Sequence, residues 1–428
     1  MDQQSVSGQD VIIVGGGMVG VALGCALASS GLRIRILESR TDQPLELIER
    51  LPELSRLGFD SRVSALTCAS QQFLTYLDAW PRMVEARVSP YTDMEVWDGQ
   101  GRGSIHFSAV ELHEPCLGHI VENRVTLAAL YQVMAGHGNI IFEPGIHIET
   151  LSAADSVGRR TLKLSDGREL TTALLVGADG AHSRIRALTG MGTTEWDYGH
   201  HAIVTTITTE HPHQDTCWQR FTEDGPLALL PLSEPGGHTL SIVWSTSPGH
   251  ARELMSLGDD AFCQALTRAF EARLGEVLTT DRRYMHPLRQ RHAQQYVKPG
   301  LALVGDAAHT IHPLAGQGVN LGLLDAAALA EVIIDAVKRG EAPGDESVLR
   351  RFQRMRRSDN LQTAAAMETF RRLFDDWPAP VKLLRSAGMG FMDRLSPVKQ
   401  HLMMMAMGLR GDIPRFARRP SPVKAKIG

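Results

Sequence analysis

The sequence predicts an α/β protein that carries an inserted antiparallel sheet and ends in a helical part. Three observations predict this fold class. Residues 10–38 have the pattern of one β-α-β unit, which places two parallel strands beside a helix. Four short segments between residues 202 and 244 are rich in β-branched and aromatic residues and are separated by Gly, Pro, Asp and Glu turns. From Glu346 onward the pattern is helical throughout.

Length and composition narrow the class of protein. The 428 residues suffice for roughly two or three domains. A net charge of -4, from 44 basic and 48 acidic residues, predicts no nucleic-acid partner. Five cysteines without C-x-x-C spacing predict neither a disulfide framework nor a zinc site, so we expect a reducing compartment. The first residues lack the features of a signal peptide, and no apolar run reaches the ~18 residues of a membrane-spanning helix. We expect a cytoplasmic protein, either free or peripheral to the inner membrane.

The β-α-β unit opens with the continuous apolar run 11–14, as expected of a strand that is buried on both faces. Residues 18–30 place apolar side chains on one helical face, and Gly31 is a typical helix stop. The second strand is expected over residues 32–37. After it, residues 41–61 are interpreted as an irregular excursion rich in Pro, Leu and Glu.

A G-x-G-x-x-G motif at residues 15–20 joins the first strand to the helix. Gly15 is expected to make a tight turn, Gly17 to let the backbone approach a pyrophosphate, and Gly20 to let the helix pack on the strand. The free N–H groups at the start of the helix then bind phosphate oxygens. The alternative is a glycine-rich turn without a ligand.

An acid follows the second strand, as a dinucleotide-binding unit of the Rossmann type requires. Glu38 lies 18 residues beyond Gly20, and Arg40 is counted with the same site. A carboxylate here accepts hydrogen bonds from ribose hydroxyls and repels a 2′-phosphate, so the motif indicates FAD or NAD rather than NADP.

Two distant segments carry further motifs, and the first of them decides between FAD and NAD. In the first, a buried strand at residues 300–304 leads into Asp306, whose carboxylate can hold a polyol hydroxyl. A glycine-rich turn then opens a helix whose N-terminus stabilises negative charge on a bound ring. The residues assigned to this turn are Pro313, Gly316, Gly318 and Asn320. The second segment, residues 176–184, contains Asp179 in an Asp-Gly pair.

These three segments together resemble the FAD-dependent aromatic hydroxylases, the superfamily that includes para-hydroxybenzoate hydroxylase. The resemblance implies that FAD is the bound cofactor and that NAD(P)H is a transient electron donor which approaches near Asp179. It also implies that reduced flavin reacts with O2 to give a C4a-hydroperoxide, which a phenol ring attacks. Arg62 and Arg124 match arginines that neighbour the flavin in this superfamily. The alternative for each is a surface salt bridge.

Further segments resemble one branch of the superfamily, the hydroxylases of ubiquinone biosynthesis. These segments are Met94–Asp98, Leu117–Asn123, Trp196–His201 and Asp306–Gly322. The branch implies a polyprenylated phenol as substrate, with O2 as co-substrate. Within the branch, Met94–Asp98 and Trp196–Tyr198 resemble the type that hydroxylates ring carbon C5 of a 2-polyprenylphenol. Partners implied are other ubiquinone-biosynthesis proteins or a second copy of the chain.

The domain organisation follows from these assignments. The substrate cavity is expected between the inserted sheet and the C-terminal helices. An FAD-binding domain is expected over 1–85, 110–190 and 290–345, a substrate domain over 86–109 and 191–289, and a C-terminal helical region with a basic tail over 346–428.

Some features keep two interpretations. Methionines between residues 389 and 407 line an apolar substrate surface or fill the core. The basic tail contacts anionic lipid or is a solvated terminus. His309 and His312 lack further ligands at metal-binding spacing, so we predict packing or flavin contact and no metal site. Two rival functions remain: hydroxylation of a small soluble aromatic, and a non-catalytic scaffold that binds lipid. No catalytic side chain is assigned, because the flavin carries the chemistry.

Overall fold

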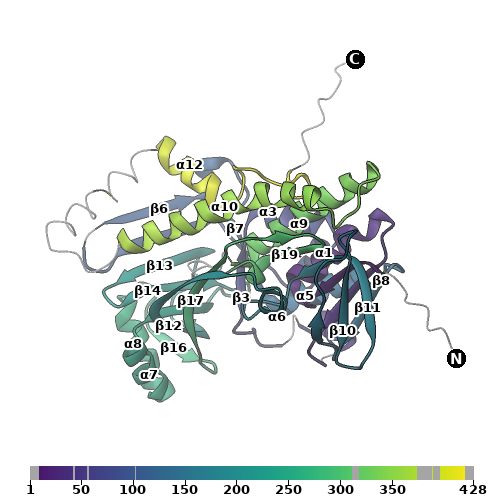
Figure 1. Cartoon of the computed structure of the whole chain (residues 1–428). Helices are drawn as coiled ribbons and strands as arrows, with labels where there is room; N and C mark the ends of the chain where they lie inside the picture. Colours follow the sequence, from purple (N-terminus) through teal and green to yellow (C-terminus); the bar gives the residue numbers. More distant parts are fainter. Residues whose placement is uncertain are drawn as a thin grey trace.

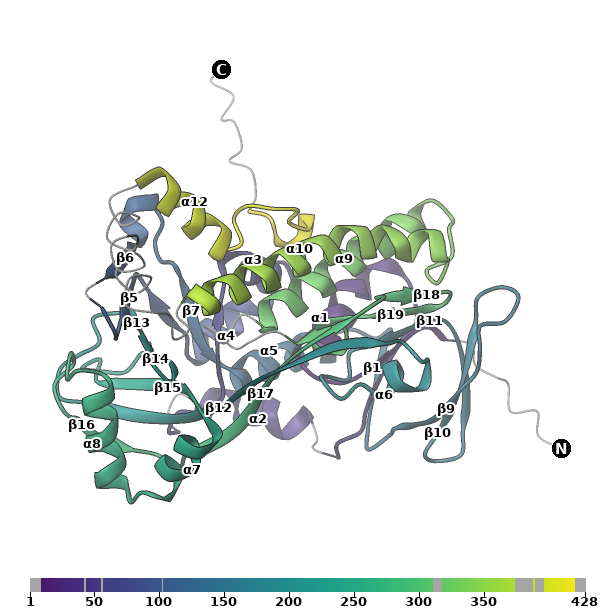
Figure 2. The same ribbon diagram turned by 60° about the vertical axis from the view of Figure 1, so that its left-hand side comes forward.

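The computed structural model describes residues 9–41, 44–54, 57–101, 103–310, 318–373, 388 and 396–419. Two large sheets occupy opposite sides of the molecule, and the long helix α10 (Glu346–Leu373) runs across both (Figure 1). The turned view in Figure 2 shows α9 (Gly318–Lys338) beside α10. This architecture confirms the predicted α/β fold class with an antiparallel sheet.

The first sheet has eight strands within the described residues. Five strands lie side by side in parallel, in the order β19-β11-β1-β2-β8. Three more pair antiparallel at its margins. The parallel strands are β1 (Gln9–Val14), β2 (Ile34–Glu38), β8 (Ile140–Pro144), β11 (Glu169–Gly177) and β19 (Leu301–Leu303), and the antiparallel ones are β9 (Ile148–Leu151), β10 (Arg160–Leu164) and β18 (Val297–Lys298).

Helix α1 (Met18–Leu27) joins β1 to β2 and completes the predicted β-α-β unit. A short 3-10 turn, η1 (Ala28–Ser30), extends it, and Gly31 ends it with a left-handed φ of 78°. Helix α1 packs against α5 (Asn123–Ala135) and α9, so its apolar side chains are buried. This core anchors the loops at the carboxyl ends of the parallel strands.

The second sheet has nine strands within the described residues. The strands expected between residues 202 and 244 pair antiparallel, as predicted. Strand β13 also pairs with β5 in parallel, which the sequence did not indicate. The strands are β5 (Asp93–Asp98), β6 (Ser104–Ser108), β12 (Thr193–Thr209), β13 (Thr216–Thr222), β14 (Gly225–Pro231), β15 (Thr239–Thr246), β16 (Val277–Thr280), β17 (Tyr284–Ala293) and β20 (His309–Thr310).

The nine-stranded sheet is covered on both faces. Helices α7 (Pro248–Ser256) and α8 (Asp259–Ala269) pack on one face in a core that includes Phe262 and Trp244. A three-stranded sheet packs on the other face, where Ala65 and Ile120 contact Cys217, Leu230 and Leu232. Its strands are β3 (Val63–Leu66), β4 (Ser89–Tyr91) and β7 (Gly118–Glu122). This second face is therefore enclosed between two sheets.

The remaining elements connect these layers. Helix α12 (Ser396–Ala406) buries Met403, and Met407 just beyond it, against Cys68 and Leu117, whereas Met405 is exposed. These two methionines therefore fill a core; Met389 and Met392 lie outside the described residues. The other elements are α2 (Pro44–Leu54), α3 (Cys68–Tyr76), α4 (Trp80–Ala86), α6 (Arg184–Leu188), η2 (Ala109–Leu112), η3 (Gly305–Ala307) and η5 (Arg415–Ala417).

Three expectations about local structure were wrong. The predicted irregular excursion contains helix α2, which buries Leu51 and Leu54 on one face. Its prolines suggested a loop, but Pro44 starts the helix, where no N–H bond is lost. The sequence pattern predicts a helix over residues 259–276, but α8 ends at Ala269, because Glu271 and Ala272 adopt positive φ. Beyond Ala406 the described chain is not continuously helical and holds only η5.

Two basic side chains of the tail lie against the protein. Arg415 pairs with Asp335 at 2.7 Å, and Arg419 pairs with Glu114 at 2.7 Å. In the described chain, no helix is long and apolar enough to cross a membrane.

Candidate active site

The glycine turn after β1 has the conformation that its sequence predicts. Gly15 has a φ of +114°, and a Cβ added there would lie 2.3 Å from the carbonyl oxygen of Ala178. A Cβ on Gly20 would lie 2.0 Å from the carbonyl oxygen of Gly15. A Cβ on Gly17, in contrast, would meet no atom within 4 Å. Gly15 and Gly20 are thus required by the turn itself, whereas Gly17 keeps space open in front of it.

The start of helix α1 is suited to an anion. Gly17 is its N-cap, and no side chain caps the helix there. The first N–H groups of a helix have no partner within the helix and carry partial positive charge. Together with the space over Gly17, these groups can bind the pyrophosphate of a dinucleotide.

Glu38 is fixed against the glycine turn. Glu38 is 8% exposed, and its carboxylate accepts the N–H of Gly16 at 2.7 Å and the N–H of Arg40 at 2.9 Å. The guanidinium Nε of Arg40 lies 3.6 Å from the same carboxylate. Tyr131 donates its hydroxyl to the carbonyl of Gly16 at 2.8 Å and braces the turn from the other side. Contact of Glu38 with a ribose stays a prediction.

The other predicted segments meet this turn at one edge of the sheet. In the parallel register Val14 lies opposite Gly177, and Gly177 lies opposite Leu303. The loops that follow these strands, including those with Asp179 and Asp306, therefore leave the same edge. A Cβ on Gly322 of α9 would lie 2.7 Å from Val19 of α1. Segments about 300 residues apart thus form one surface.

The two acids of these loops differ in their surroundings. Asp179 accepts the hydroxyl of Ser183 at 2.5 Å and the N–H of Ile185 at 3.1 Å, so it holds the start of α6. Asp306 is exposed to solvent, although the surrounding protein raises the pKa of its carboxyl, and His309 opposes the rise. Asp306 is therefore the more accessible of the two to a ligand hydroxyl.

The two predicted arginines also differ. Arg62 is exposed, and its guanidinium has no hydrogen bond or ion pair within the described residues. Arg124 donates to Glu122 at 2.6 Å, in a pair where the side chain of Glu122 is only 2% exposed. Arg87 binds the second oxygen of Glu122 at 2.5 Å. The structure thus places Arg124 in a buried ion-pair cluster and leaves Arg62 free to reach a ligand.

Of the glycine-rich turn before α9, only its end lies within the described residues; Pro313, Gly316 and His312 lie outside them. Gly318 begins α9, and a Cβ on it would meet nothing within 4 Å. Asn320 is 2% exposed. It donates to Ala65 O at 2.7 Å and accepts the N–H of Thr67 at 2.9 Å and the hydroxyl of Ser70 at 2.7 Å. Asn320 thus joins α9 to β3 and α3.

Sequence reasoning missed a buried polar cluster behind this surface. Asp325 of α9 accepts the N–H of Gly305 at 3.1 Å, and His309 Nε2 lies 2.5 Å from the same oxygen. Its second oxygen accepts Arg356 of α10 at 2.9 Å and Asn360 at 3.1 Å. Burial opposes ionisation, but His309 and Arg356 lower the pKa of Asp325 to about 2. The available signal was an acid flanked on both sides by apolar residues within a predicted helix.

A small cavity lies where the enclosed face of the nine-stranded sheet meets the three-stranded sheet. Its volume is about 20 Å³. Among the residues that line it are Ala65, Tyr91, Met94, Cys217, Gln219 and Leu230. Ala65 is also the residue whose carbonyl binds Asn320, so one strand connects this cavity to the first turn of α9.

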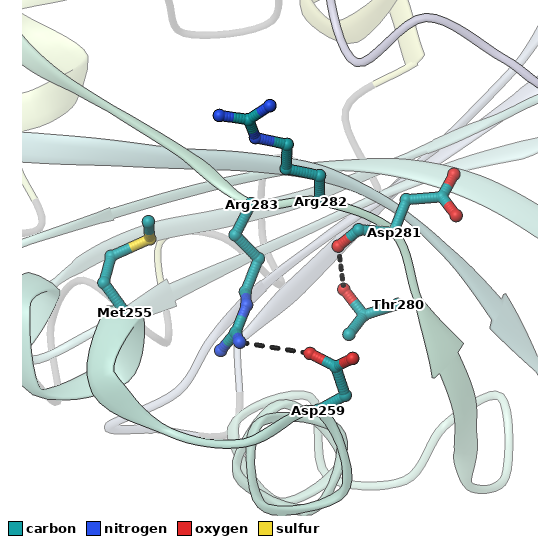
Figure 3. Close-up of a pocket in the computed structure, with 6 residues that line it drawn as sticks. All are labelled: Met255, Asp259, Thr280, Asp281, Arg282 and Arg283. Carbon is teal, nitrogen blue, oxygen red and sulfur yellow. Dashed lines mark hydrogen bonds and ion pairs between the residues drawn. The ribbon is translucent and has the colours of Figure 1, made fainter.

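A larger cavity, of about 520 Å³, lies on the other side of the nine-stranded sheet, between α7, α8 and β16 (Figure 3). Arg283 pairs there with Asp259 at 3.1 Å and donates to the carbonyls of Leu254 and Leu257. These contacts close α7 and α8 onto the sheet. None of the predicted cofactor residues lines this cavity.

Comparison with known proteins decides the family. A family model described as an FAD binding domain matches residues 9–365. The chain belongs to this family of FAD-dependent monooxygenases. It is 36% identical to 3-demethoxyubiquinol 3-hydroxylase of Escherichia coli K12, over 94% of this chain and 98% of the relative. It is 34% identical to the ubiquinone biosynthesis monooxygenase COQ6 of Xenopus tropicalis, over 93% of each chain, and 35% identical to ubiquinone hydroxylase UbiL of Rhodospirillum rubrum, over 96% and 92%.

Solved structures of this flavoenzyme fold agree. The p-nitrophenol 4-monooxygenase PnpA from Pseudomonas putida DLL-E4 aligns with a TM-score of 0.74 at 17% identity, covering 94% of this chain and 98% of its own. PqsL from Pseudomonas aeruginosa aligns with a TM-score of 0.72 at 22% identity, covering 90% and 99%. The predicted fold and the prediction of FAD as cofactor are confirmed.

The geometry of this flavoenzyme fits FAD. Gly17 leaves the uncapped end of α1 open, which suits a pyrophosphate. Asp306 offers an exposed carboxylate for a polyol hydroxyl. The start of α9 places its N–H groups beside the same surface, where they favour negative charge on a reduced ring. FAD, when bound, supplies the redox and oxygen-transfer chemistry that no side chain of the chain can perform.

Proposed function

We propose that this enzyme hydroxylates the aromatic ring of a polyprenylated phenol in ubiquinone biosynthesis, with FAD, NAD(P)H and O2. Three relatives that match nearly the whole chain carry names from ubiquinone biosynthesis, which supports this substrate class. The structural observation that carries the proposal is the bond between Asn320 and Ala65. It joins the helix of the flavin site directly to the wall of a cavity between two sheets.

The chain's own residues have defined tasks in this proposal. Gly17 and the start of α1 bind the pyrophosphate, and Glu38 orients the adenosine ribose. Asp306 and the start of α9 hold the polyol and the ring. Asp179, next to α6, holds in place the loop that the nicotinamide approaches. Arg62, whose guanidinium is exposed, neighbours the flavin. Residues of the two facing sheets exclude water from the ring that is hydroxylated.

The ring position is part of the proposal. Residues 94–98 and 196–198 favour C5 by resemblance, whereas the Escherichia coli relative is named as a 3-hydroxylase. We keep C5 as the proposed position, and the structure of the accumulating intermediate will decide it. The same analysis separates a prenylated phenol from a small soluble aromatic.

Association with the inner membrane and with other ubiquinone-biosynthesis proteins, or with a second copy, is proposed on the nature of the substrate. A polyprenyl chain partitions into lipid, so an enzyme that takes it benefits from contact with the membrane surface. Because Arg415 and Arg419 are paired with acids, such contact would use basic residues of the tail beyond them.

The test is deletion of the gene in its host, followed by mass spectrometry of the lipid extract. We expect a prenylated phenol that lacks one ring oxygen to accumulate and ubiquinone to fall. Wild-type gene should restore ubiquinone, and a Gly17→Ala gene should not. Unchanged ubiquinone, with no prenylphenol accumulating, would contradict the proposal.

A further inference from the structure

The loop that carries Arg62 is held by one buried carboxylate. Glu122 is 2% exposed, and its Oε1 accepts the N–H of Asp60 at 2.7 Å. The same oxygen accepts Arg124 Nη2 at 2.6 Å, whereas Oε2 accepts Arg87 Nε at 2.8 Å. Hydrogen bonds between ionised partners are short and strong, so a carboxylate bound through both oxygens is fixed in position. Glu122 is therefore a rigid centre behind this loop.

The two arginines extend the contact to the backbone of the loop, residues 57–62. Arg124 donates through Nη2 to the carbonyl of Gly58 at 2.5 Å. Arg87 donates through Nη1 to the carbonyl of Leu57 at 3.1 Å. A guanidinium suits this task, because its several N–H groups can bind a carboxylate and a backbone carbonyl at the same time. The loop is thus bound to the carboxylate both directly and through two arginines.

Arg62 is fixed through its backbone alone. Its N–H donates to Asp60 Oδ1 at 3.0 Å, and its carbonyl accepts the N–H of Asn123 at 3.0 Å. Its guanidinium is exposed and has no partner within the described residues. Strand β3 runs from the next residue to Ala65, which binds Asn320 at the start of α9, so Arg62 lies about 10 Å along the strand from that contact. The charge of Arg62 is therefore available close to the flavin site.

We infer that Glu122 is a positioning residue for FAD, and that it acts by holding the loop which places the guanidinium of Arg62 at the flavin site. This inference rests on the place that the proposed function gives to Arg62. Glu122 itself offers nothing to a ligand, because both of its oxygens are bound within the protein. A guanidinium that is already in place binds more tightly, because no loop has to be ordered when the ligand arrives.

The test is a double-mutant cycle between Glu122 and Arg62. The dissociation constant of FAD is measured by titrating FAD into the full-length apoprotein and following flavin fluorescence. Arg62→Ala should raise it about 10- to 100-fold, as loss of a charge-assisted hydrogen bond implies. Glu122→Gln should raise it about 10-fold, because the loop no longer places that guanidinium. The double variant should bind FAD within about twofold of Arg62→Ala alone, since the two residues act through one contact.

Several results would overturn the inference. If the two losses multiply in the double variant, Glu122 acts through Arg124 or through stability and not through Arg62. An Arg62→Ala protein with normal FAD affinity would overturn it too. Arg87→Lys is a milder second variant in case Glu122→Gln does not fold, because it keeps the charge but loses the planar fork. Its effect on FAD affinity should likewise disappear in the Arg62→Ala background, and persistence there would overturn the inference. Coupled losses in an enzyme that forms no hydroxylated product would instead overturn the proposed function and leave the role of Glu122 standing.

A matched control is the carboxylate of Glu143 on β8. It is also shared by two arginines, Arg35 and Arg168, and it does not contact the loop. Glu143→Gln should lower the resistance of the apoprotein to urea, as Glu122→Gln does, but should leave the FAD dissociation constant within about twofold of the wild type. An equal rise of that constant in both variants would mean that Glu122 affects FAD through stability alone, which would overturn the inference.

Discussion

His309 Nε2 lies 2.5 Å from Asp325 Oδ2, and both side chains are almost fully buried. This pair joins the loop after β19, which carries Asp306, to helix α9. Because Asp325 also binds Arg356, the cluster links that loop to the C-terminal helix α10. The loop that carries Asp306 is thus held in place by the buried charges of Asp325 and Arg356.

We expect Asp325→Asn to destabilise the protein by about 3 kcal/mol, since it removes the fully buried carboxylate that pairs with Arg356 and leaves this guanidinium only its pair with Asp359, which is partly exposed. FAD should also dissociate more readily, because the neutral amide oxygen of asparagine is a weaker acceptor for the N–H of Gly305 than the carboxylate of Asp325. Urea unfolding and fluorescence of released flavin measure the two effects. Glu346→Gln, which removes an exposed pair with Arg350, should cost under about 1 kcal/mol. Equal effects of the two substitutions would contradict the role of the cluster.

Two glycines of the turn should respond differently to alanine. Gly17→Ala meets no atom within 4 Å, so the apoprotein should keep its free energy of unfolding. Its FAD dissociation constant should rise roughly 10- to 100-fold, because the methyl group occupies the path of the pyrophosphate. Gly20→Ala would overlap the carbonyl of Gly15, so apoprotein stability should fall by about 3 kcal/mol. A stable Gly17→Ala protein with normal FAD affinity would refute the assignment.

Asn320→Ala should lower stability by about 2 kcal/mol, since it leaves Ala65, Thr67 and Ser70 without their buried partner. It should also raise the KM for substrate, because Ala65 lines the cavity. Asn139→Ala is the control: its amide nitrogen donates to the backbone carbonyls of Ala28 and Leu32, away from the site. If Asn139→Ala raises KM as much, the effect of Asn320 reflects stability alone.

Stability should fall below neutral pH because of two buried histidines. Burial lowers the pKa of His119 and of His292 to about 4. Above about pH 6.5 both histidines are neutral in the folded and in the unfolded protein. Neither residue then makes the free energy of unfolding depend on pH. Between pH 6.5 and 4 the unfolded chain binds protons that the folded chain does not, and the free energy of unfolding falls.

Each of these histidines can lower the free energy of unfolding by at most about 3 kcal/mol between pH 6.5 and pH 4. Urea unfolding at several pH values should show a shallower slope for His292→Asn than for the wild type. His286→Asn, at an exposed position, should leave the slope unchanged. An unchanged slope for His292→Asn would mean that His292 is protonated in the folded protein.

The features that the sequence predicted well are those fixed by local backbone geometry. Gly15 must adopt positive φ within a short turn, and Gly31 must stop a helix, so a few residues suffice to recognise them. The roles of Asn320 and Arg124 depend on partners that local pattern does not reveal. Asn320 binds residues about 250 positions away, and Arg124 shares Glu122 with Arg87.

The small cavity between the two sheets also could not be predicted from local sequence pattern alone. Strand alternation places Gln219 and Cys217 on one face of β13, but only the packing of β3 and β4 makes that face enclosed. Helix α2 was missed because its prolines outweighed the spacing of Leu51 and Leu54.

The most direct test of the central claim is incubation of the FAD-loaded enzyme with a 2-polyprenylphenol, NADH or NADPH and oxygen-18 gas. The account predicts a product in which one oxygen-18 atom is bonded to a ring carbon, in amounts that follow the nicotinamide consumed. Nicotinamide oxidation that yields only hydrogen peroxide, with no labelled phenol, would contradict it.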